Sequence, residues 1–268
     1  KEFVKKVEKL IPLGRMAKKN EYNFLVLFLA SNNSSYLNGT TIIADGGRSV
    51  WWFTMNILIV GLGSIGQRHL RNIKRLYPKT NFFSYRRKFK TPFLDNFNNV
   101  KNFDLRSKYK LTYINSLNNL KRYKLDATFI CTPSSFHVDE TIKIIDQNIN
   151  VFVEKPLALN FEDLDKIEEA WKKSDKILMV GFNRRYAPFT EEIKTFFKNR
   201  ISPMIAYYRI NAENIPHDHW VYDKKEGGGR IISEACHFID YLTYVIGSKP
   251  IQVFTSSITA QKSQDMVD

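Results

Sequence analysis

The fold of most of this chain is decided by the stretch Asn56-Ile57-Leu58-Ile59-Val60-Gly61-Leu62-Gly63-Ser64-Ile65-Gly66. Mostly apolar, β-favouring residues run directly into a glycine-rich turn. After the turn, apolar residues recur at helical spacing as far as Leu76. The pattern therefore predicts a strand, a tight turn and an amphipathic helix, in that order.

The glycines of this turn have the G-x-G-x-x-G spacing of a dinucleotide-binding site. Gly61 permits the turn, Gly63 lets the backbone approach a pyrophosphate, and Gly66 lets the helix pack closely on the strand. The helix begins near Ser64 and Ile65, where free N–H groups and the positive end of the helix dipole would face the phosphates. Because the motif lies between a predicted strand and a predicted helix, we expect these five residues to bind a dinucleotide cofactor.

The composition is that of a packed globular protein. Of 268 residues, 43% are hydrophobic, and this length allows one large domain or two medium ones. The net charge of +14 has two interpretations: attraction for nucleotides, nucleotide sugars or nucleic acid, or lysines spread over a solvated surface. We favour the second, because the lysines form no single block and no nucleic-acid motif occurs.

Targeting signals are not evident in the sequence. No stretch approaches the ~20 apolar residues of a membrane span, and the N-terminus lacks the apolar segment of a signal peptide. The two cysteines, Cys131 and Cys236, stand in apolar contexts, which fits a reducing compartment. We expect a cytoplasmic protein with neither a membrane nor a nucleic-acid partner. The chain begins at Lys1 rather than Met, which indicates a fragment.

Residues 1–50 do not belong with the rest of the chain. Helices are predicted over Phe3–Leu10 and Asn20–Ala30, and a short strand over Thr40–Ala44. The motifs P-L-G-R, F-L-A-S, S-S-Y-L-N-G and D-G-G occur in this order, and the segment resembles the C-terminal tail of a short-chain dehydrogenase/reductase. That family's nucleotide turn and its Tyr-x-x-x-Lys pair are absent. We therefore expect no activity from this segment and no sheet for its strand to join.

The remaining chain is predicted to alternate strands and helices, which indicates a parallel sheet. Residues 51–54 are interpreted as a junction, and Met55, directly before the first predicted strand, as the natural start of a second protein. Further strands are predicted at Asn81–Arg86, Val100, Leu111–Ile114, Asp126–Cys131, Val151–Val153 and Ile177–Gly181. Helices are predicted after Thr132, as far as about Asn148, and over Phe161–Lys173. This gives a Rossmann domain over residues 55–181 and a partial second domain over residues 182–268.

The end of the second strand indicates the choice of cofactor. An enzyme that uses NAD carries an acid about 20 residues beyond the turn, but this place holds Arg86, followed by Arg87. Two guanidinium groups could hold the 2′-phosphate of NADP. The alternatives are that both arginines are solvated or stack on adenine. The sequence favours NADP, with NAD possible.

Four motifs in order carry a resemblance to a known family: the glycine turn, Cys131-Thr132-Pro133 with His137, Glu154-Lys155-Pro156, and Gly181-Phe182-Asn183-Arg184-Arg185-Tyr186. Residues 55–268 resemble the Gfo/Idh/MocA oxidoreductases. The resemblance implies an N-terminal Rossmann domain and a C-terminal α/β domain with an open antiparallel sheet. It also implies NAD(P)-dependent oxidation or reduction at a hydroxyl-bearing carbon of a sugar, cyclitol or nucleotide sugar, by a homo-oligomer when complete.

The resemblance assigns roles to residues at strand ends. Lys155, with Glu154, is placed at the cofactor, where the Lys155 ammonium could bond a substrate hydroxyl or tune a proton acceptor; the alternative is a surface lysine in a turn. Thr132, Pro133 and His137 either line the cofactor or cap and pack the following helix. Two further residues, Asn183 and Arg184, are expected to face the substrate.

The second domain carries the rest of the expected chemistry. Strands are predicted over Pro203–Ile210 and Ile251–Ser256. A loop with His217, His219 and Trp220 is expected to face the substrate. Two alternating histidines without a third placed ligand are weak evidence for a metal, so none is predicted.

A helix opens at the triple glycine, residues 227–229, and places Glu234 and His237 on one face. His237 is the candidate general base, with Glu234 as the carboxylate near it. Ser233 occupies the place where many family members have an Asp, and it is expected to face the substrate. This helix and the preceding D-H-W resemble a subgroup associated with cell-surface polysaccharide biosynthesis.

Three functions compete. The first is an oxidoreductase that uses Lys155, His237 and Glu234. The second is a cofactor-binding regulatory protein, and the third is an inactive fusion fragment. Since the second domain is expected to be incomplete, we expect cofactor binding and little turnover from these 268 residues.

Overall fold

The computed structural model describes residues 2–8, 11–48, 54–87, 92–212, 215–216 and 218–256. The chain divides into two compact units, one of residues 1–55 with 76–79 and the other of residues 56–75 with 80–268. The expectations for Trp51–Phe53, His217 and residues 257–268 lie outside the described residues.

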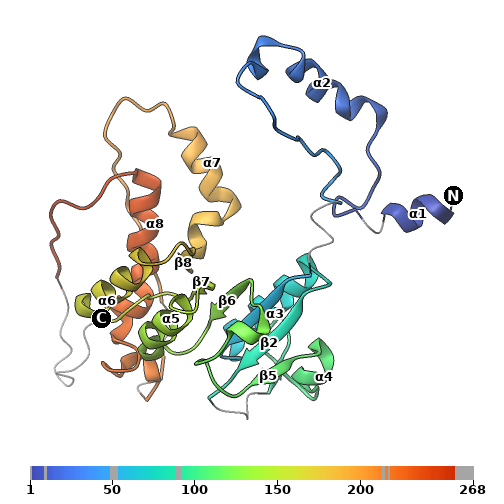
Figure 1. Cartoon of the computed structure of the whole chain (residues 1–268). Helices are drawn as coiled ribbons and strands as arrows, with labels where there is room; N and C mark the ends of the chain where they lie inside the picture. The colour runs from blue at the N-terminus through green and yellow to red at the C-terminus, as the bar shows by residue number, and fades with distance from the viewer. Residues whose placement is uncertain are drawn as a thin grey trace. The chain divides into compact units, whose positions relative to one another are not determined.

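The larger unit is built on a six-stranded parallel sheet with the strand order β5-β2-β1-β6-β7-β8 (Figure 1). The strands are β1 (Asn56–Val60), β2 (Asn81–Tyr85), β5 (Thr112–Ile114), β6 (Ala127–Ile130), β7 (Asn150–Val153) and β8 (Leu178–Val180). This is the order of a doubly wound Rossmann sheet, in which the direction of winding reverses between β1 and β6. Ligands of such sheets bind at the carboxyl ends of the strands near that point. The predicted fold class is confirmed.

Helices connect the strands; those over residues 64–76, 137–145 and 161–172 were expected from the sequence, and the one over residues 105–109 was not. They are α3 (Ser64–Leu76), α4 (Leu105–Tyr109), α5 (His137–Ile145) and α6 (Phe161–Lys172), with the short 3-10 turns η4 (Lys121–Tyr123) and η5 (Ser134–Phe136). The Asn160 side chain caps α6 by accepting from Asp163 N at 2.9 Å. A small antiparallel pair, β3 (Phe93–Leu94) with β4 (Val100–Lys101), lies between β2 and α4 in the chain.

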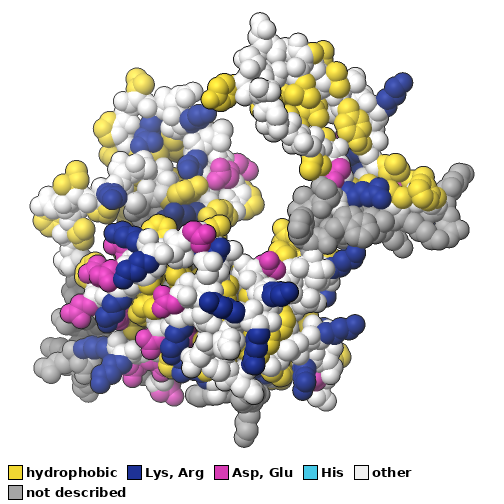
Figure 2. Space-filling view, viewed as in Figure 1, with side chains coloured by type: hydrophobic (Ala, Val, Ile, Leu, Met, Phe, Trp, Pro, Cys, Tyr) yellow, Lys and Arg dark blue, Asp and Glu magenta, His cyan; other side chains and the backbone are white. Residues whose placement is uncertain are grey.

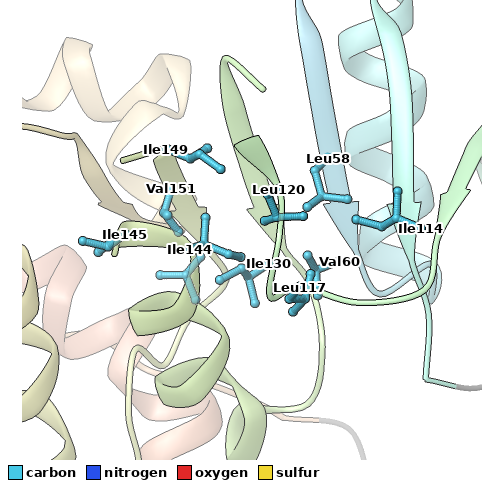
Figure 3. Close-up of a cluster of buried hydrophobic side chains, with 11 residues drawn as sticks. Leu58, Val60, Ile114, Leu117, Leu120, Ile130, Ile144, Ile145, Ile149 and Val151 are labelled. Carbon is cyan, nitrogen blue, oxygen red and sulfur yellow. The ribbon is translucent and has the colours of Figure 1, made fainter. Parts of the chain in front are cut away.

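The core explains why β1 is apolar throughout. A central parallel strand is covered on both faces, so alternation with polar residues is not needed. Leu58 and Val60 lie on one face of β1 and are fully buried. They pack in a cluster with side chains of β5, β6, β7 and α5 (Figure 3): Leu58, Val60, Ile114, Leu117, Leu120, Ile130, Ile144, Ile145, Ile149, Val151 and Val153.

Beyond β8 the same unit is helical. Its elements are η6 (Asn183–Tyr186), α7 (Pro188–Phe196), η7 (Trp220–Tyr222), the π-helix η8 (Ile231–Ala235) and α8 (Cys236–Ile246). The strands predicted over residues 203–210 and 251–256 are wrong, because neither segment forms a strand or pairs with one among the described residues. An extended segment becomes a strand only when a neighbour takes its N–H and C=O groups. In the described part of the chain, no segment does so for these two. The predicted boundary after Gly181 stays a prediction, since both sides lie in one compact unit.

The smaller unit contains α1 (Glu2–Glu8), η1 (Lys19–Tyr22), α2 (Asn23–Leu29) and η2 (Asn32–Ser34). Arg15 forms a two-bond ion pair with Glu21, at 2.7 and 2.6 Å. The strand predicted over Thr40–Ala44 is not formed, and the described residues offer it no pairing partner. No residue of α2 is buried, although its sequence is almost entirely apolar.

Surface charge is dispersed. Figure 2 shows Lys and Arg side chains scattered among Asp and Glu on the visible face, with no single basic block. None of the described helices combines the length and apolar character needed to cross a membrane.

Candidate active site

The glycine turn has the geometry of a phosphate cradle. Gly61 has a φ of +86°, and a Cβ there would stand 2.8 Å from Cys131 O. A Cβ on Gly66 would stand 2.0 Å from Gly61 O, so no side chain fits between α3 and the turn. Around Gly63, by contrast, a Cβ would meet no atom within 4 Å. The residues therefore fit a dinucleotide, because an open backbone lies directly before the N-terminus of α3.

The two arginines after β2 have different environments. Arg86 is only 8% exposed and lies against Tyr113, with its Nη1 3.4 Å from the Tyr113 hydroxyl. Arg87 is more exposed; its guanidinium stacks on the Phe136 ring at 3.9 Å, and its Nε donates to Glu140 at 3.2 Å. Arg87 is thus paired with a carboxylate before any cofactor phosphate is present.

Glu140 was not predicted from the sequence. Its side chain is 1% exposed, and its Oε2 accepts from the Thr132 hydroxyl at 2.6 Å. Burial raises the pKa of this carboxyl, while Thr132 and Arg87 oppose the shift. The available signal was a lone acid on the buried face of α5. Through its contacts with Arg87 and Thr132, Glu140 connects the segment after β2 to the segment after β6.

His137 has a position that favours the packing alternative. The ring is buried, with Nδ1 2.7 Å from Pro156 O and Nε2 2.8 Å from Thr132 O. Burial lowers its pKa, and a neutral imidazole can donate to only one of the two carbonyls. The ring links the turns that follow β6 and β7. Contact of Thr132, Pro133 and His137 with the cofactor stays a prediction.

Glu154 contacts a residue that the sequence analysis missed. Its Oε1 lies 2.7 Å from His69 Nε2, and the two side chains are about equally exposed. The His69 ring packs against Phe129 and Phe152, with centroids 5.4 and 5.0 Å apart. His69 belongs to α3, so this pair ties the cofactor helix to the end of β7.

The structure brings the three predicted catalytic residues to one cavity of about 570 Å³, lined by Lys155, Glu234 and His237 among others. Lys155 follows β7, and the other two lie on η8 and α8. The Lys155 ammonium donates to the backbone carbonyl of Ser233. This contact joins the carboxyl edge of the sheet to the π-helix, a helix type that is frequent at functional sites.

The side chains of Glu234 and Ser233 have other hydrogen-bond partners than the sequence led us to expect. Glu234 pairs with Arg230, Oε2 to Nε at 2.7 Å, although it lines the same cavity as His237. The Ser233 hydroxyl is buried and donates to Gly229 O at 2.7 Å, so it is the carbonyl of Ser233 that contacts Lys155.

His237 itself is held in its neutral form. Its Nδ1 is buried and has no hydrogen-bond partner among the described residues, which leaves Nε2 as the nitrogen available to a ligand. Burial, followed by the positive charges of Lys155 and Arg184, lowers the pKa of His237 to about 4. The imidazole is therefore a proton acceptor at neutral pH.

The predicted substrate residues divide into two groups. Arg184 lines the cavity, with its guanidinium 4.7 Å from the Phe238 ring centroid. Asn183, His219 and Trp220 are not among its lining residues. His219 instead caps η7 by accepting from Val221 N at 3.3 Å, and its ring lies 5.5 Å from that of Trp220. Among the described residues, no three His, Cys, Asp or Glu side chains gather as a metal site.

Comparison with known proteins agrees with the fold found for residues 55–182. These residues match the Gfo/Idh/MocA family model, "Oxidoreductase family, NAD-binding Rossmann fold". "Uncharacterized oxidoreductase YrbE" of Bacillus subtilis is 26% identical over 196 residues, 73% of this chain and 55% of the relative. "Myo-inositol 2-dehydrogenase" of Thermotoga maritima is 30% identical over 130 residues, 48% of this chain and 39% of the relative.

A crystal structure of a probable dehydrogenase from Thermotoga maritima has the same fold, with a TM-score of 0.57 and 24% identity, covering 73% of this chain and 56% of that one. The chain thus spans about half the length of the proteins it is similar to. Residues 1–49 match a different family model, "Enoyl-(Acyl carrier protein) reductase". The model match, the relatives and the cradle geometry agree that residues 55–182 are similar to the NAD-binding Rossmann fold of the Gfo/Idh/MocA oxidoreductases.

Proposed function

We propose that this chain is part of an NAD(P)-dependent oxidoreductase acting on a hydroxyl-bearing carbon of a sugar, cyclitol or nucleotide sugar. The observation that carries the proposal is that Lys155 and His237, from separate elements, line one cavity at the carboxyl edge of the Rossmann sheet. The name of the Thermotoga maritima relative, a myo-inositol dehydrogenase, supports a polyhydroxylated substrate.

The nicotinamide, when bound, supplies the carbon that accepts or returns the hydride. His237 accepts the hydroxyl proton on Nε2 as the hydride leaves the substrate carbon, so the alcohol loses two hydrogens and becomes a carbonyl. Lys155 donates to the substrate oxygen and orients it, while the Ser233 carbonyl holds the ammonium at the cavity wall. Burial of His237, followed by the positive charge of Lys155, lowers the pKa of the imidazole and favours the neutral form that accepts the proton.

We further propose NADP as the preferred cofactor, with Arg86 and Arg87 as ligands of its 2′-phosphate. The support is the absence of an acid at this position and the location of both arginines after β2. Because Glu140 already bonds Arg87, a 2′-phosphate would compete with this carboxylate for the guanidinium. A role in surface-polysaccharide biosynthesis is proposed on the sequence resemblance around Glu234 and His237 alone.

The test measures formation of reduced nicotinamide with NADP or NAD and a panel of sugars and cyclitols. It uses a version of the protein extended to the full length of its relatives, since little turnover is expected from residues 1–268 alone. Lys155→Met and His237→Ala should each lower turnover about 10²–10⁴-fold with nearly unchanged cofactor affinity. Since the two residues act on one proton, the double variant should be little worse than the worse single variant. The control is Lys172→Met, which removes an exposed lysine of α6 that pairs with Glu168. Parental turnover in either single variant would show that its residue is structural.

A further inference from the structure

The wall of the cavity carries an excess of positive charge. Four cationic side chains line it, Lys155, Arg184, Arg209 and Arg230, against one carboxylate, Glu234. Glu234 is paired with Arg230. In the described part of the chain, no carboxylate forms an ion pair with any of the other three cations. Three of the four cations at the cavity therefore have no ion-pair partner among the described residues.

The two neighbouring residues Arg184 and Arg185 differ in whether a carboxylate pairs with them. Arg185 directly follows Arg184, yet it forms a two-bond ion pair with Asp240, with Nε 2.8 Å from Oδ2. Arg184 instead lies over the Phe238 ring, with its guanidinium 4.7 Å from the ring centroid, and no carboxylate of the described residues pairs with it. A planar guanidinium supported on one face is well suited to bind a carboxylate or phosphate through two parallel bonds.

We propose that the substrate of this cavity carries an anionic group, a carboxylate or a phosphate, which Arg184 and Arg209 bind beside the reacting hydroxyl. This inference rests on the proposed function and narrows its substrate class. A neutral sugar would leave three like charges facing one another across the cavity, whereas an anion compensates them. The anion could be the carboxylate of a sugar acid or the diphosphate of a nucleotide sugar, and both offer oxygens to the same guanidinium donors.

Binding of the anion would also act on His237. The charged groups that act on its imidazole are Lys155 and Arg184, which disfavour protonation, and Glu154 and Asp240, which favour it. A negative group bound to Arg184 offsets one of the positive charges, so the imidazole becomes a stronger base when the correct substrate is present. Substrate charge and proton transfer are then coupled through Arg184.

The experiment measures binding of three probes by calorimetry in the presence of saturating cofactor: glucose, glucuronate and uridine diphosphate. We expect glucuronate or uridine diphosphate to bind at least tenfold more tightly than glucose. The tighter of the two anions identifies the source of the charge. Arg184→Gln and Arg209→Gln should each weaken binding of that anion about tenfold and leave binding of glucose nearly unchanged.

The matched control is Arg122→Gln, which removes the same charge from η4, before the amino end of β6 and so at the other edge of the sheet. It should leave the affinities for all three probes as in the parent. Equal affinity for glucose and both anions, or loss of anion binding in Arg122→Gln as large as in Arg184→Gln, would overturn the proposal. If glucose binds and is oxidised while the anions are not preferred, the anion proposal fails and the oxidoreductase function stands. If cofactor binds but no sugar or cyclitol of the panel is turned over, the oxidoreductase function itself fails.

Discussion

Short apolar runs, which predict strands, have different outcomes in the Rossmann sheet and in the region after β8. Short apolar runs predicted β6 and β7, and both formed because parallel neighbours take their backbone groups. Similar runs at residues 203–210 and 251–256 form no strand and have no pairing partner among the described residues. Strand propensity is thus expressed only where a neighbouring strand is available, while the helices around the cavity form in both regions.

The largest expected contrast between the two regions is in stability. Leu58→Ala removes a fully buried side chain from the sheet core and should lower the free energy of unfolding by about 2–5 kcal/mol. Ile205→Ala removes a side chain that is 97% exposed and should change it by less than about 0.5 kcal/mol. Urea unfolding of both variants measures the difference. An equal loss of unfolding free energy in both variants would mean that residues 203–210 are buried in solution. It would contradict the contrast between the sheet and the region after β8.

The fold could be predicted from the sequence where the signal is local. The apolar run of β1 and the glycine turn each determine their own structure. The cavity was predicted in part, since the family resemblance, rather than spacing, brought Lys155 and His237 together. Glu140 and His69 were missed, because the partner of a buried charge depends on which segments the folded chain brings side by side.

Substitutions at two glycines of the turn should separate an effect on stability from an effect on cofactor binding. Gly66→Ala should destabilise the protein by about 2–4 kcal/mol, because its Cβ would stand 2.0 Å from Gly61 O. Gly63→Ala meets no atom within 4 Å and should leave the melting temperature unchanged. Its methyl group should instead weaken dinucleotide binding, because it stands where a phosphate approaches. Thermal melts with and without cofactor test both statements, and unchanged dinucleotide affinity in Gly63→Ala would place the phosphates elsewhere.

A smaller effect is expected at the Glu140–Arg87 pair. Arg87→Gln should weaken NADP binding more than NAD binding, by roughly tenfold, if Arg87 contacts the 2′-phosphate. Glu140→Gln removes the competing charge and should strengthen NADP binding several-fold while NAD binding stays nearly constant. Calorimetry with both dinucleotides measures the ratio. An unchanged ratio in both variants would leave Arg87 a purely structural residue stacked on Phe136.

The measurement that tests the shared cavity most directly is the NMR titration of His237 in the protein and in Lys155→Met. Burial, followed by the positive charges of Lys155 and Arg184, disfavours protonation of the imidazole, so the pKa of His237 should be about 4 in the parent. The Lys155→Met variant lacks the first of these charges. Removing this positive charge should raise the pKa of His237 toward its ordinary value near ~6.5, and Lys172→Met should not change it. A His237 pKa near ~6.5 in the parent, unchanged in Lys155→Met, would contradict the claim that the two residues share one cavity.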